Sequence, residues 1–415
     1  MYKLTPEQLL LDLYQAFHDA CKHKGSKQYV LYFKENLDFN LQELRDDLWS
    51  RTYAPSPSSC FVVTYPKLRE VFAAEFRDRI VHHLYYNYTI DLFSRTFIQD
   101  SYSCLPGRGT HYGISRLEQH IRQESRGYSR PCYVLKMDIS GYFMHINRHR
   151  LLSICLGSLR KMSSHRVLRR VPKTWNDVVD MEFLEYLSRE IILLNPIVNC
   201  RMVGSLHDWD NLPAGKSLFH LPDGLGLPIG NLTSQLFSNV YLNVLDQWMK
   251  RQMQCEHYGR YVDDFYVVSS DKRFLLELVN KVRLFLETEL DLQVQQGKTM
   301  LFNVRQGVPF LGAYLKPGRR YVENRTIRHM KAKLGDLKIS SGLEYSLNSF
   351  LGVLGHYRSY NIRRELMLKL NDFSQYGFFD PNLKKFYKYS AHPSLHKSTC
   401  TGGRSREVPP LFLHV

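Results

Sequence analysis

Apolar residues recur at helical spacing through the first part of the chain. Spacings of three and four residues place side chains on one face of an α-helix. Two such series precede Pro55, namely Leu9, Leu13 and Phe17, then Leu41, Leu44 and Leu48. The pattern predicts a helical N-terminal extension over residues 1–60.

Other stretches concentrate aromatic and β-branched residues, which is typical of strands. They are 60–65, 133–138 and 260–268. In the last stretch, two short runs flank Asp263 and Asp264, which predicts a strand, a tight turn and a second strand. Helical patterns return at 236–249, 274–290 and 325–390. Strands and helices in this mixture predict an α+β fold.

The charge balance of the chain favours a polyanionic partner. Among 415 residues, 56 Lys and Arg face 40 Asp and Glu, a formal net charge of +16. Cationic surfaces bind nucleic acid by releasing counterions, and the 13% aromatic content supplies rings on which bases stack. No apolar run of 18 residues occurs, so we expect no membrane association. The eight cysteines are scattered, which favours reduced thiols and a cytoplasmic protein.

The adjacent carboxylates of Asp263 and Asp264 are the strongest candidate chemistry. Like charges side by side are stable only in open solvent or next to a cation. A solvated turn is one interpretation, and a Mg²⁺ site is the other, because Mg²⁺ prefers carboxylate oxygens. A third carboxylate decides between them. Asp138 ends a hydrophobic strand, where we expect it to meet the hairpin.

Two further segments have the composition of nucleotide-binding elements. Lys67 and Arg69 lie between predicted strands, where a basic ribbon could hold phosphates; an ordinary charged hairpin is the alternative. Residues 224–230 form a glycine-rich turn that lets the backbone approach a flat ligand such as a base pair. Residues 151–224 contain helical patterns and a loop whose role the sequence does not disclose.

Five motifs follow one another along the chain: D-I-x-x-Y-F, G-L-P-I-G-x-x-x-S, Y-V-D-D, G-K-T and F-L-G. In this order they resemble the motifs of prokaryotic reverse transcriptases, and the resemblance runs from about residue 25 to residue 365. It implies a right-hand polymerase fold of fingers, palm and thumb. The implied parts are fingers at 61–132, palm at 133–150 and 225–315, an insertion at 151–224 that is partly fingers, a basic helical thumb at 325–390 and a tail at 391–415.

The resemblance also implies roles for single residues. Asp138, Asp263, Asp264 and the backbone carbonyl of Ile139 would bind two Mg²⁺ ions, with Mn²⁺ a possible substitute. The implied dNTP-binding residues are Lys67, Arg69, Ile139, Ile229, Gly230, Tyr142 and Phe143. Of these, Tyr142 would exclude a 2′-hydroxyl, with Phe143 the second candidate for that role. Lys298 matches a lysine that protonates or steadies the leaving pyrophosphate. A solvated surface lysine is the alternative.

Two dipeptides depart from the usual family pattern and narrow the resemblance to a subgroup of these enzymes. Related intron and retroviral enzymes carry Gln-Gly where this chain has Ile229-Gly230, and intron enzymes have Ser-Pro where it has Ser234-Gln235. This pattern resembles the reverse transcriptases of diversity-generating retroelements and some antiphage defence systems. The implied partners are a dedicated non-coding template RNA, an RNA/DNA or DNA primer-template, dNTPs, and an accessory protein or second reverse transcriptase.

The alternatives are a catalytically idle RNA-binding protein with a polymerase fold, an RNA polymerase, and a group II intron-like or retron reverse transcriptase. Intact Asp138, Asp263 and Asp264 argue against the idle protein. A small residue in place of Tyr142 would favour the RNA polymerase.

Overall fold

The structure, a computed structural model, describes residues 4–64, 67–165, 174–175, 179–335, 343–369 and 377–389. It divides into two compact units, Met1–Arg319 and Arg320–Val415. The predicted tail at 391–415 lies outside the described residues. Within the described residues, no helix is both long and apolar enough to cross a membrane.

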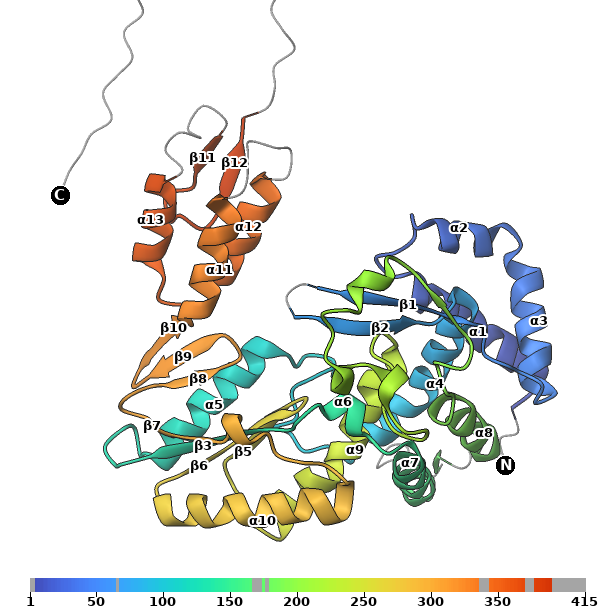
Figure 1. Ribbon diagram of the computed structural model, residues 1–415, viewed down its shortest axis with the longest axis horizontal. Coiled ribbons are helices and arrows are strands. Elements are labelled where there is room, and N and C mark those ends of the chain that lie inside the picture. Colours follow the sequence, from blue (N-terminus) through green and yellow to red (C-terminus); the bar gives the residue numbers. More distant parts are fainter. Residues whose placement is uncertain are drawn as a thin grey trace, which may run out of the picture. The chain divides into compact units, whose positions relative to one another are not determined.

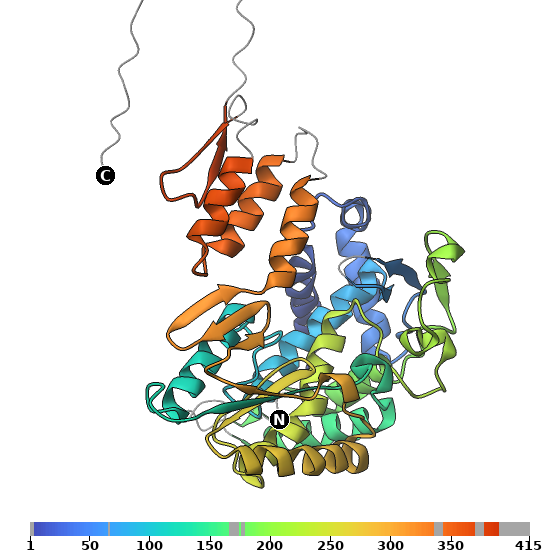
Figure 2. The same ribbon diagram turned by 60° about the vertical axis from the view of Figure 1, so that its left-hand side comes forward.

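The first unit begins with the helices that the apolar spacing predicts: α1 (Pro6–Cys21), α2 (Gln28–Glu35) and α3 (Leu37–Trp49). Thr5 starts α1, because its hydroxyl accepts a hydrogen bond from the Gln8 amide and Pro6 fits the first turn. The fully buried Leu9 and Leu13 face α3 and the long helix α4 (Phe76–Ser94). Figures 1 and 2 show α1 and α4 side by side.

A small three-stranded sheet follows these helices. Its strands are β1 (Ser58–Val63), β2 (Arg69–Ala73) and β4 (Cys200–Met202), in the order β2-β1-β4. β1 and β2 form an antiparallel hairpin, whereas β4 lies parallel to β1. The segment between 151 and 224 therefore contributes a strand to this sheet. Its described residues also include helix α8 (Met181–Ile192), short 3₁₀ turns and most of α7 (Arg148–Ser163).

The central sheet has four antiparallel strands in the order β5-β6-β3-β7. They are β3 (Tyr133–Asp138), β5 (Tyr258–Tyr261), β6 (Asp264–Ser269) and β7 (Met300–Asn303). The predicted strand at 133–138 and the predicted hairpin are both confirmed. Helices α5 (Thr110–Glu124) and α10 (Lys272–Leu290) pack against this sheet (Figure 1), and α9 (Leu232–Arg251) packs against α4 and α7.

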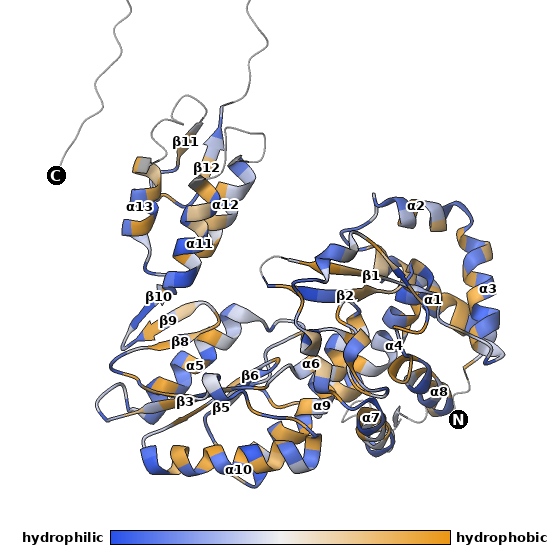
Figure 3. Cartoon of the chain, viewed as in Figure 1, coloured by the Kyte–Doolittle hydropathy of each residue, from blue (hydrophilic) through white to orange (hydrophobic). Residues whose placement is uncertain are grey.

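Helix α10 illustrates how the sequence pattern builds the core. Its buried residues recur every three or four positions: Leu275, Leu278, Val282, Leu286 and Leu290. Charged residues lie between them, Glu277, Lys281 and Arg283 among others, so blue and orange alternate along the helix in Figure 3. Burial of this apolar stripe fixes α10 on the sheet.

The first unit ends with the hairpin of β8 (Val308–Phe310) and β9 (Ala313–Lys316), and β10 (Arg319–Val322) follows. The second unit contains α11 (Asn324–Gly335), α12 (Leu343–Leu354), α13 (Tyr360–Lys369), β11 (Gly377–Phe379) and β12 (Phe386–Lys388). It has its own core, which includes Met330, Leu351 and Phe386. The prediction of helix throughout 325–390 is wrong at β11 and β12, which form an antiparallel hairpin. The α+β class is confirmed.

Candidate functional site

The central sheet brings the three predicted carboxylates together. Asp138, the last residue of β3, is the direct cross-strand partner of Asp264, the first residue of β6. Asp263 precedes Asp264 in the tight turn between β5 and β6. The expectation that Asp138 meets the hairpin is confirmed.

Two lysine ammonium groups lie against these carboxylates. Lys298 Nζ donates to both oxygens of Asp138, at 2.9 and 3.0 Å. Lys136 Nζ lies 3.3 Å from Asp264 Oδ2. Lys136 was not among the predicted site residues, although its position in the strand indicates this contact. Residues two apart in a strand share a face, so Lys136 lies on the same face of β3 as Asp138.

The carboxylates of Asp263 and Asp264 retain protons more strongly than isolated side chains do. Burial and the nearby Asp138 carboxylate raise the pKa of Asp263 to about 6. Burial also raises the pKa of Asp264, against the opposing effect of Lys136. Both shifts reflect negative charge concentrated where water is partly excluded. A divalent cation would relieve this repulsion.

We tested whether the residues fit a metal ion. Within the described part of the chain, no group of three or more His, Cys, Asp or Glu side chains is arranged to hold a metal as it stands. The donors nevertheless have the right chemistry, because carboxylate oxygens suit hard divalent cations and two ammonium groups already occupy positions against them. Ile139 bridges Val294, but the hydrogen bonds of that bridge use Ser140 N–H and the Asp138 carbonyl, so they leave the Ile139 carbonyl unused.

The glycine-rich turn docks on the strand that carries Arg69. The carbonyl of Ile229 accepts a hydrogen bond of 2.8 Å from the Phe72 amide in β2. A Cβ atom on Gly230 would lie 2.8 Å from the Phe72 carbonyl oxygen, so glycine permits this close approach. Arg69 and Lys67 are exposed at the same end of β2. The structure thus joins Ile229, Gly230 and Arg69 through one strand.

The structure argues against Tyr142 as the residue that meets the sugar. Its side chain is only 2% exposed, and its hydroxyl donates to the Ser238 carbonyl at 2.6 Å. A ring held in the core cannot be the first contact of a nucleotide. Phe143 is half-buried, and its carbonyl accepts a hydrogen bond from Leu227 in the glycine-rich segment. The role expected of Tyr142, contact with the sugar, therefore suits Phe143 better.

The segment of unknown role is tied to β2 through a buried carboxylate. Glu70 is 1% exposed and accepts three hydrogen bonds, from Trp209 Nε1, Ser217 Oγ and the Leu218 amide, at 2.7 to 2.9 Å. Arg69 is the exposed neighbour of this anchor, so the segment braces the strand that carries it. This contact could not be predicted from the sequence, because a Glu next to an Arg is typical of a solvent-exposed surface.

A cavity of about 570 Å³ lies beside Gly230 of the glycine-rich turn. Its lining combines cationic and aromatic side chains, Lys24, Arg79, Arg201, Tyr29 and Phe61 among them. The Arg79 guanidinium lies over the Tyr29 ring, 4.8 Å from its centre. Such a lining suits a nucleic-acid strand, whose phosphates attract cations and whose bases stack on rings.

The chain is similar to several known proteins. E. coli (strain K12) protein YkfC is 26% identical over 332 residues, which are 70% of this chain and 75% of YkfC. The structure of Candida tropicalis apo telomerase has a TM-score of 0.47 and 11% identity, and that of Candida albicans telomerase with a telomeric RNA fragment has 0.44 and 11%. These likenesses cover 77% and 78% of this chain but only 57% of each telomerase chain.

The family comparison is the decisive one. Residues 67–315, more than half of the chain, match the family described as reverse transcriptase (RNA-dependent DNA polymerase). The matched range contains Asp138, Asp263, Asp264 and Lys298. The chain therefore belongs to the reverse transcriptase family of RNA-dependent DNA polymerases.

Proposed function

We propose that this protein copies an RNA template into DNA at the site formed by Asp138, Asp263 and Asp264. The observation that carries the proposal is the pairing of Asp138 with Asp264 across β3 and β6, with Asp263 in the adjoining turn. This arrangement concentrates three carboxylates at one edge of a rigid sheet. Family membership makes nucleotidyl transfer the reaction that such a cluster serves.

Reverse transcriptases generally use divalent metal ions, and we infer Mg²⁺ for this chain, with Mn²⁺ as a substitute. Asp138, Asp263, Asp264 and the Ile139 carbonyl, which the bridge to Val294 does not use, would hold two ions. When bound, the ions would activate the primer 3′-hydroxyl and neutralise the charge of the departing pyrophosphate. The chain's own contribution is to hold these oxygen donors in place before substrate arrives.

The neighbouring residues supply the rest of the substrate site. The exposed Arg69, with Lys67, would bind the triphosphate. Lys298, which now donates to Asp138, would shift to the pyrophosphate and deliver a proton to it. We place the ring that meets the sugar at Phe143 rather than at the buried Tyr142.

The cationic and aromatic cavity beside Gly230 would receive the template strand. In the terms of the polymerase hand, 61–132 would be fingers, 133–150 and 225–315 palm, and 325–390 thumb. The 1–60 helices would support the fingers, and the 151–224 segment would belong partly to them. The strand β4 and the Glu70 contacts support that last placement.

For the biological setting, we propose that the template is a dedicated non-coding RNA, in a diversity-generating retroelement or an antiphage defence system in the cytoplasm. An accessory protein or a second reverse transcriptase is a further expected partner. The supporting observation is Ile229, whose side chain packs in an apolar cluster with Phe72 and Leu218. An apolar contact there would hold the templating base pair without polar discrimination.

The test is primer extension by the purified protein with Mg²⁺, on RNA and DNA templates of the same sequence, with dNTPs and NTPs supplied separately. The proposal expects DNA synthesis on the RNA template from dNTPs. Incorporation only of NTPs would replace it with RNA polymerase activity. Tight template binding without any synthesis would favour the catalytically idle protein.

A further inference from the structure

The turn that carries the catalytic carboxylates contains a disfavoured backbone. Val262, immediately before Asp263, has a φ of +55°. This left-handed region is rare for residues other than glycine, and a β-branched side chain is among the least suited to it. The surrounding structure must therefore impose the conformation on Val262.

Both backbone polar groups of Val262 are held by side chains. Its amide donates to Ser103 Oγ at 3.1 Å. Its carbonyl accepts from Arg260 Nη1 at 2.9 Å. Val262 is thus held by two side chains, Ser103 from the loop before α5 and Arg260 from β5.

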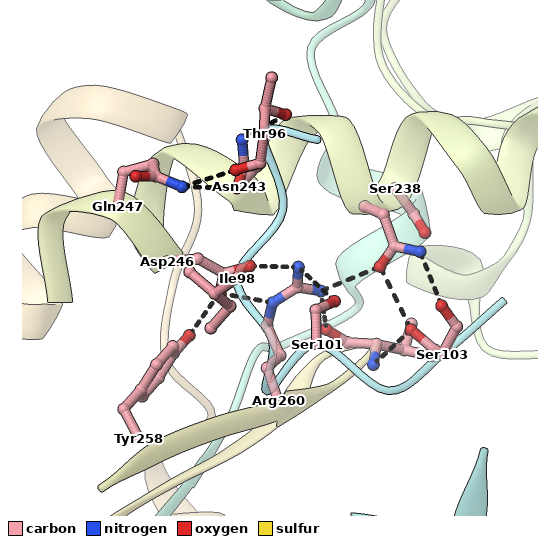
Figure 4. A network of polar contacts seen from close by, with 12 residues as sticks. Thr96, Ile98, Ser101, Ser103, Ser238, Asn243, Asp246, Gln247, Tyr258 and Arg260 are labelled. Atoms are coloured by element: carbon pink, nitrogen blue, oxygen red, sulfur yellow. Dashed lines mark hydrogen bonds and ion pairs between the residues drawn. The ribbon is translucent and has the colours of Figure 1, made fainter. Parts of the chain in front are cut away.

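Arg260 is itself fixed in every direction. It is completely buried, and its five guanidinium N–H groups match five hydrogen bonds, two of them to Asp246 at 2.8 and 2.6 Å (Figure 4). The other three go to the Asn239 side chain, the Val262 carbonyl and the Ser101 hydroxyl. Tyr258 donates a further hydrogen bond to Asp246.

Helix α9 supplies the base of this network. Asp246 and Asn239 are seven residues apart, two helical turns, so they share one face of α9. Asn239 also accepts a hydrogen bond from Ser103 Oγ at 3.2 Å and donates to the Ser103 carbonyl at 2.9 Å. The two side chains that grip Val262 are therefore connected to each other through Asn239.

Stability alone does not account for such a network. Replacing a fully desolvated ion pair with apolar residues is often neutral or stabilising, so a buried pair is weak support for a purely structural role. What an apolar replacement could not do is donate to the Val262 carbonyl. The network is specific to the geometry of the turn.

We propose that Arg260 and Ser103, anchored by Asp246 and Asn239, are positioning residues that impose the left-handed turn at Val262 and thereby aim Asp263 and Asp264 at the metal ions. This inference rests on the proposed function of those two aspartates. It adds four residues that contact neither metal nor nucleotide in their own right.

The test uses Ser103→Ala, which removes one grip and leaves the Arg260–Asp246 pair intact. Mn²⁺ affinity is measured by electron paramagnetic resonance on the full chain, without template or dNTP. Loss of a group that orients metal ligands weakens metal binding about 10- to 100-fold, and we expect a loss in this range. In primer extension, kcat should fall and half-saturation should need more Mg²⁺, with template affinity unchanged.

The same substitution in a Val262→Gly protein makes the test specific to the turn. Glycine adopts positive φ without strain, so in a Val262→Gly protein the same Ser103→Ala change should weaken Mn²⁺ binding less than about threefold. Ser188→Ala, which removes a buried hydroxyl in α8 that donates to Leu184, is the matched control. It should lower thermal stability and leave Mn²⁺ affinity unchanged.

Two results would overturn the proposal. One is unchanged Mn²⁺ affinity in Ser103→Ala, and the other is an equal loss in the valine and glycine backgrounds. A wild-type protein that binds Mn²⁺ but makes no DNA would refute the proposed function and leave this test intact, since the metal titration needs no synthesis.

Discussion

The ammonium group of Lys298 contacts both carboxylate oxygens of Asp138, at 2.9 and 3.0 Å, although 160 positions separate the two residues. Lys298 is about half exposed, so it can leave this contact without disturbing the core. In the proposed reaction it has two successive partners: Asp138 in the metal-free chain, then the pyrophosphate once metal neutralises Asp138.

The Lys298→Gln variant distinguishes the role of Lys298 at the pyrophosphate from its role at Asp138. General-acid groups typically contribute about 10²–10⁴-fold, so we expect kcat for dNTP incorporation to fall by at least about 100-fold. The Mg²⁺ concentration for half-saturation should stay equal or fall, because the ammonium no longer competes for Asp138. Lys281→Gln, the same charge change on an exposed position of α10, is the control. A higher Mg²⁺ requirement with unchanged kcat would show that Lys298 only organises the carboxylates.

Sugar selection should depend on Phe143 and not on Tyr142. A single contact in a binding pocket discriminates by about 10- to 200-fold, so Phe143→Ala should lose dNTP over rNTP preference in that range. Tyr142→Ala removes a buried ring and should instead destabilise the protein by about 3–5 kcal/mol. The measurements are single-nucleotide incorporation with each substrate and chemical denaturation.

Tyr142→Phe is the control for that pair of variants. It removes only the hydrogen bond to Ser238, a loss of about 1 kcal/mol, and should leave selectivity intact. Relaxed selectivity in Tyr142→Phe, or none in Phe143→Ala, would return the role to Tyr142.

The sequence alone could not show which of these two neighbours, Tyr142 or Phe143, is buried. The strand pattern correctly predicted β3, and the short helix α6 (Tyr142–His145) follows it. However, α6 is a single turn, too short for apolar periodicity to show which of two adjacent aromatic residues faces the core. That choice depends on α9, whose Ser238 carbonyl accepts the Tyr142 hydroxyl.

The hairpin and the pairing of Asp138 with it were predictable, because both depend on local sequence and not on a distant helix. Short runs of aromatic and β-branched residues mark the hairpin on either side of Asp263 and Asp264, and Asp138 ends the buried strand that pairs with β6. The grip on Val262 was not predictable, because it depends on side chains from α9 and from the loop before α5. Nothing in the letters Y-V-D-D shows a positive φ.

Fidelity should respond to Ile229. Its backbone is fixed by the bond from Phe72, so Ile229→Gln changes the side chain while the turn stays in place. An amide that only a correct base pair satisfies can add about 1–3 kcal/mol of discrimination, so misincorporation should fall. In a diversity-generating system the fall should be largest opposite adenine.

The measurement is sequencing of cDNA from wild type, Ile229→Gln and the apolar control Ile229→Leu, on one template at equal dNTP concentrations. Identical error spectra would rule this role out. An accurate wild type would favour the defence setting.

The raised pKa of Asp263 predicts a pH dependence of metal binding. Because its pKa is about 6 in the folded chain and 3.8 ordinarily, the metal-free protein gains stability from this group at low pH and loses it as pH rises through about 6. Mg²⁺ binds the ionised form, so stabilisation by Mg²⁺ should be small near pH 5 and larger near pH 7.5. The measurement is the shift in thermal unfolding temperature that Mg²⁺ causes at each of the two pH values.

Asp263→Asn should flatten that pH dependence, because the amide does not titrate. A Mg²⁺ effect that is equally large at both pH values in wild type would contradict the account of Asp263.

The most direct test of the central claim is primer extension on an RNA template with dNTPs and Mg²⁺, comparing wild type with Asp263→Asn. The substitution keeps the shape of the side chain and removes its charge. Because loss of even an outer partner of a metal ligand lowers activity about 10- to 100-fold, we expect a fall of at least about 100-fold. Template affinity should change little, and Asp210→Asn on an exposed loop should behave as wild type. Synthesis by Asp263→Asn at near wild-type rate would contradict the assignment of the carboxylate cluster as the catalytic site.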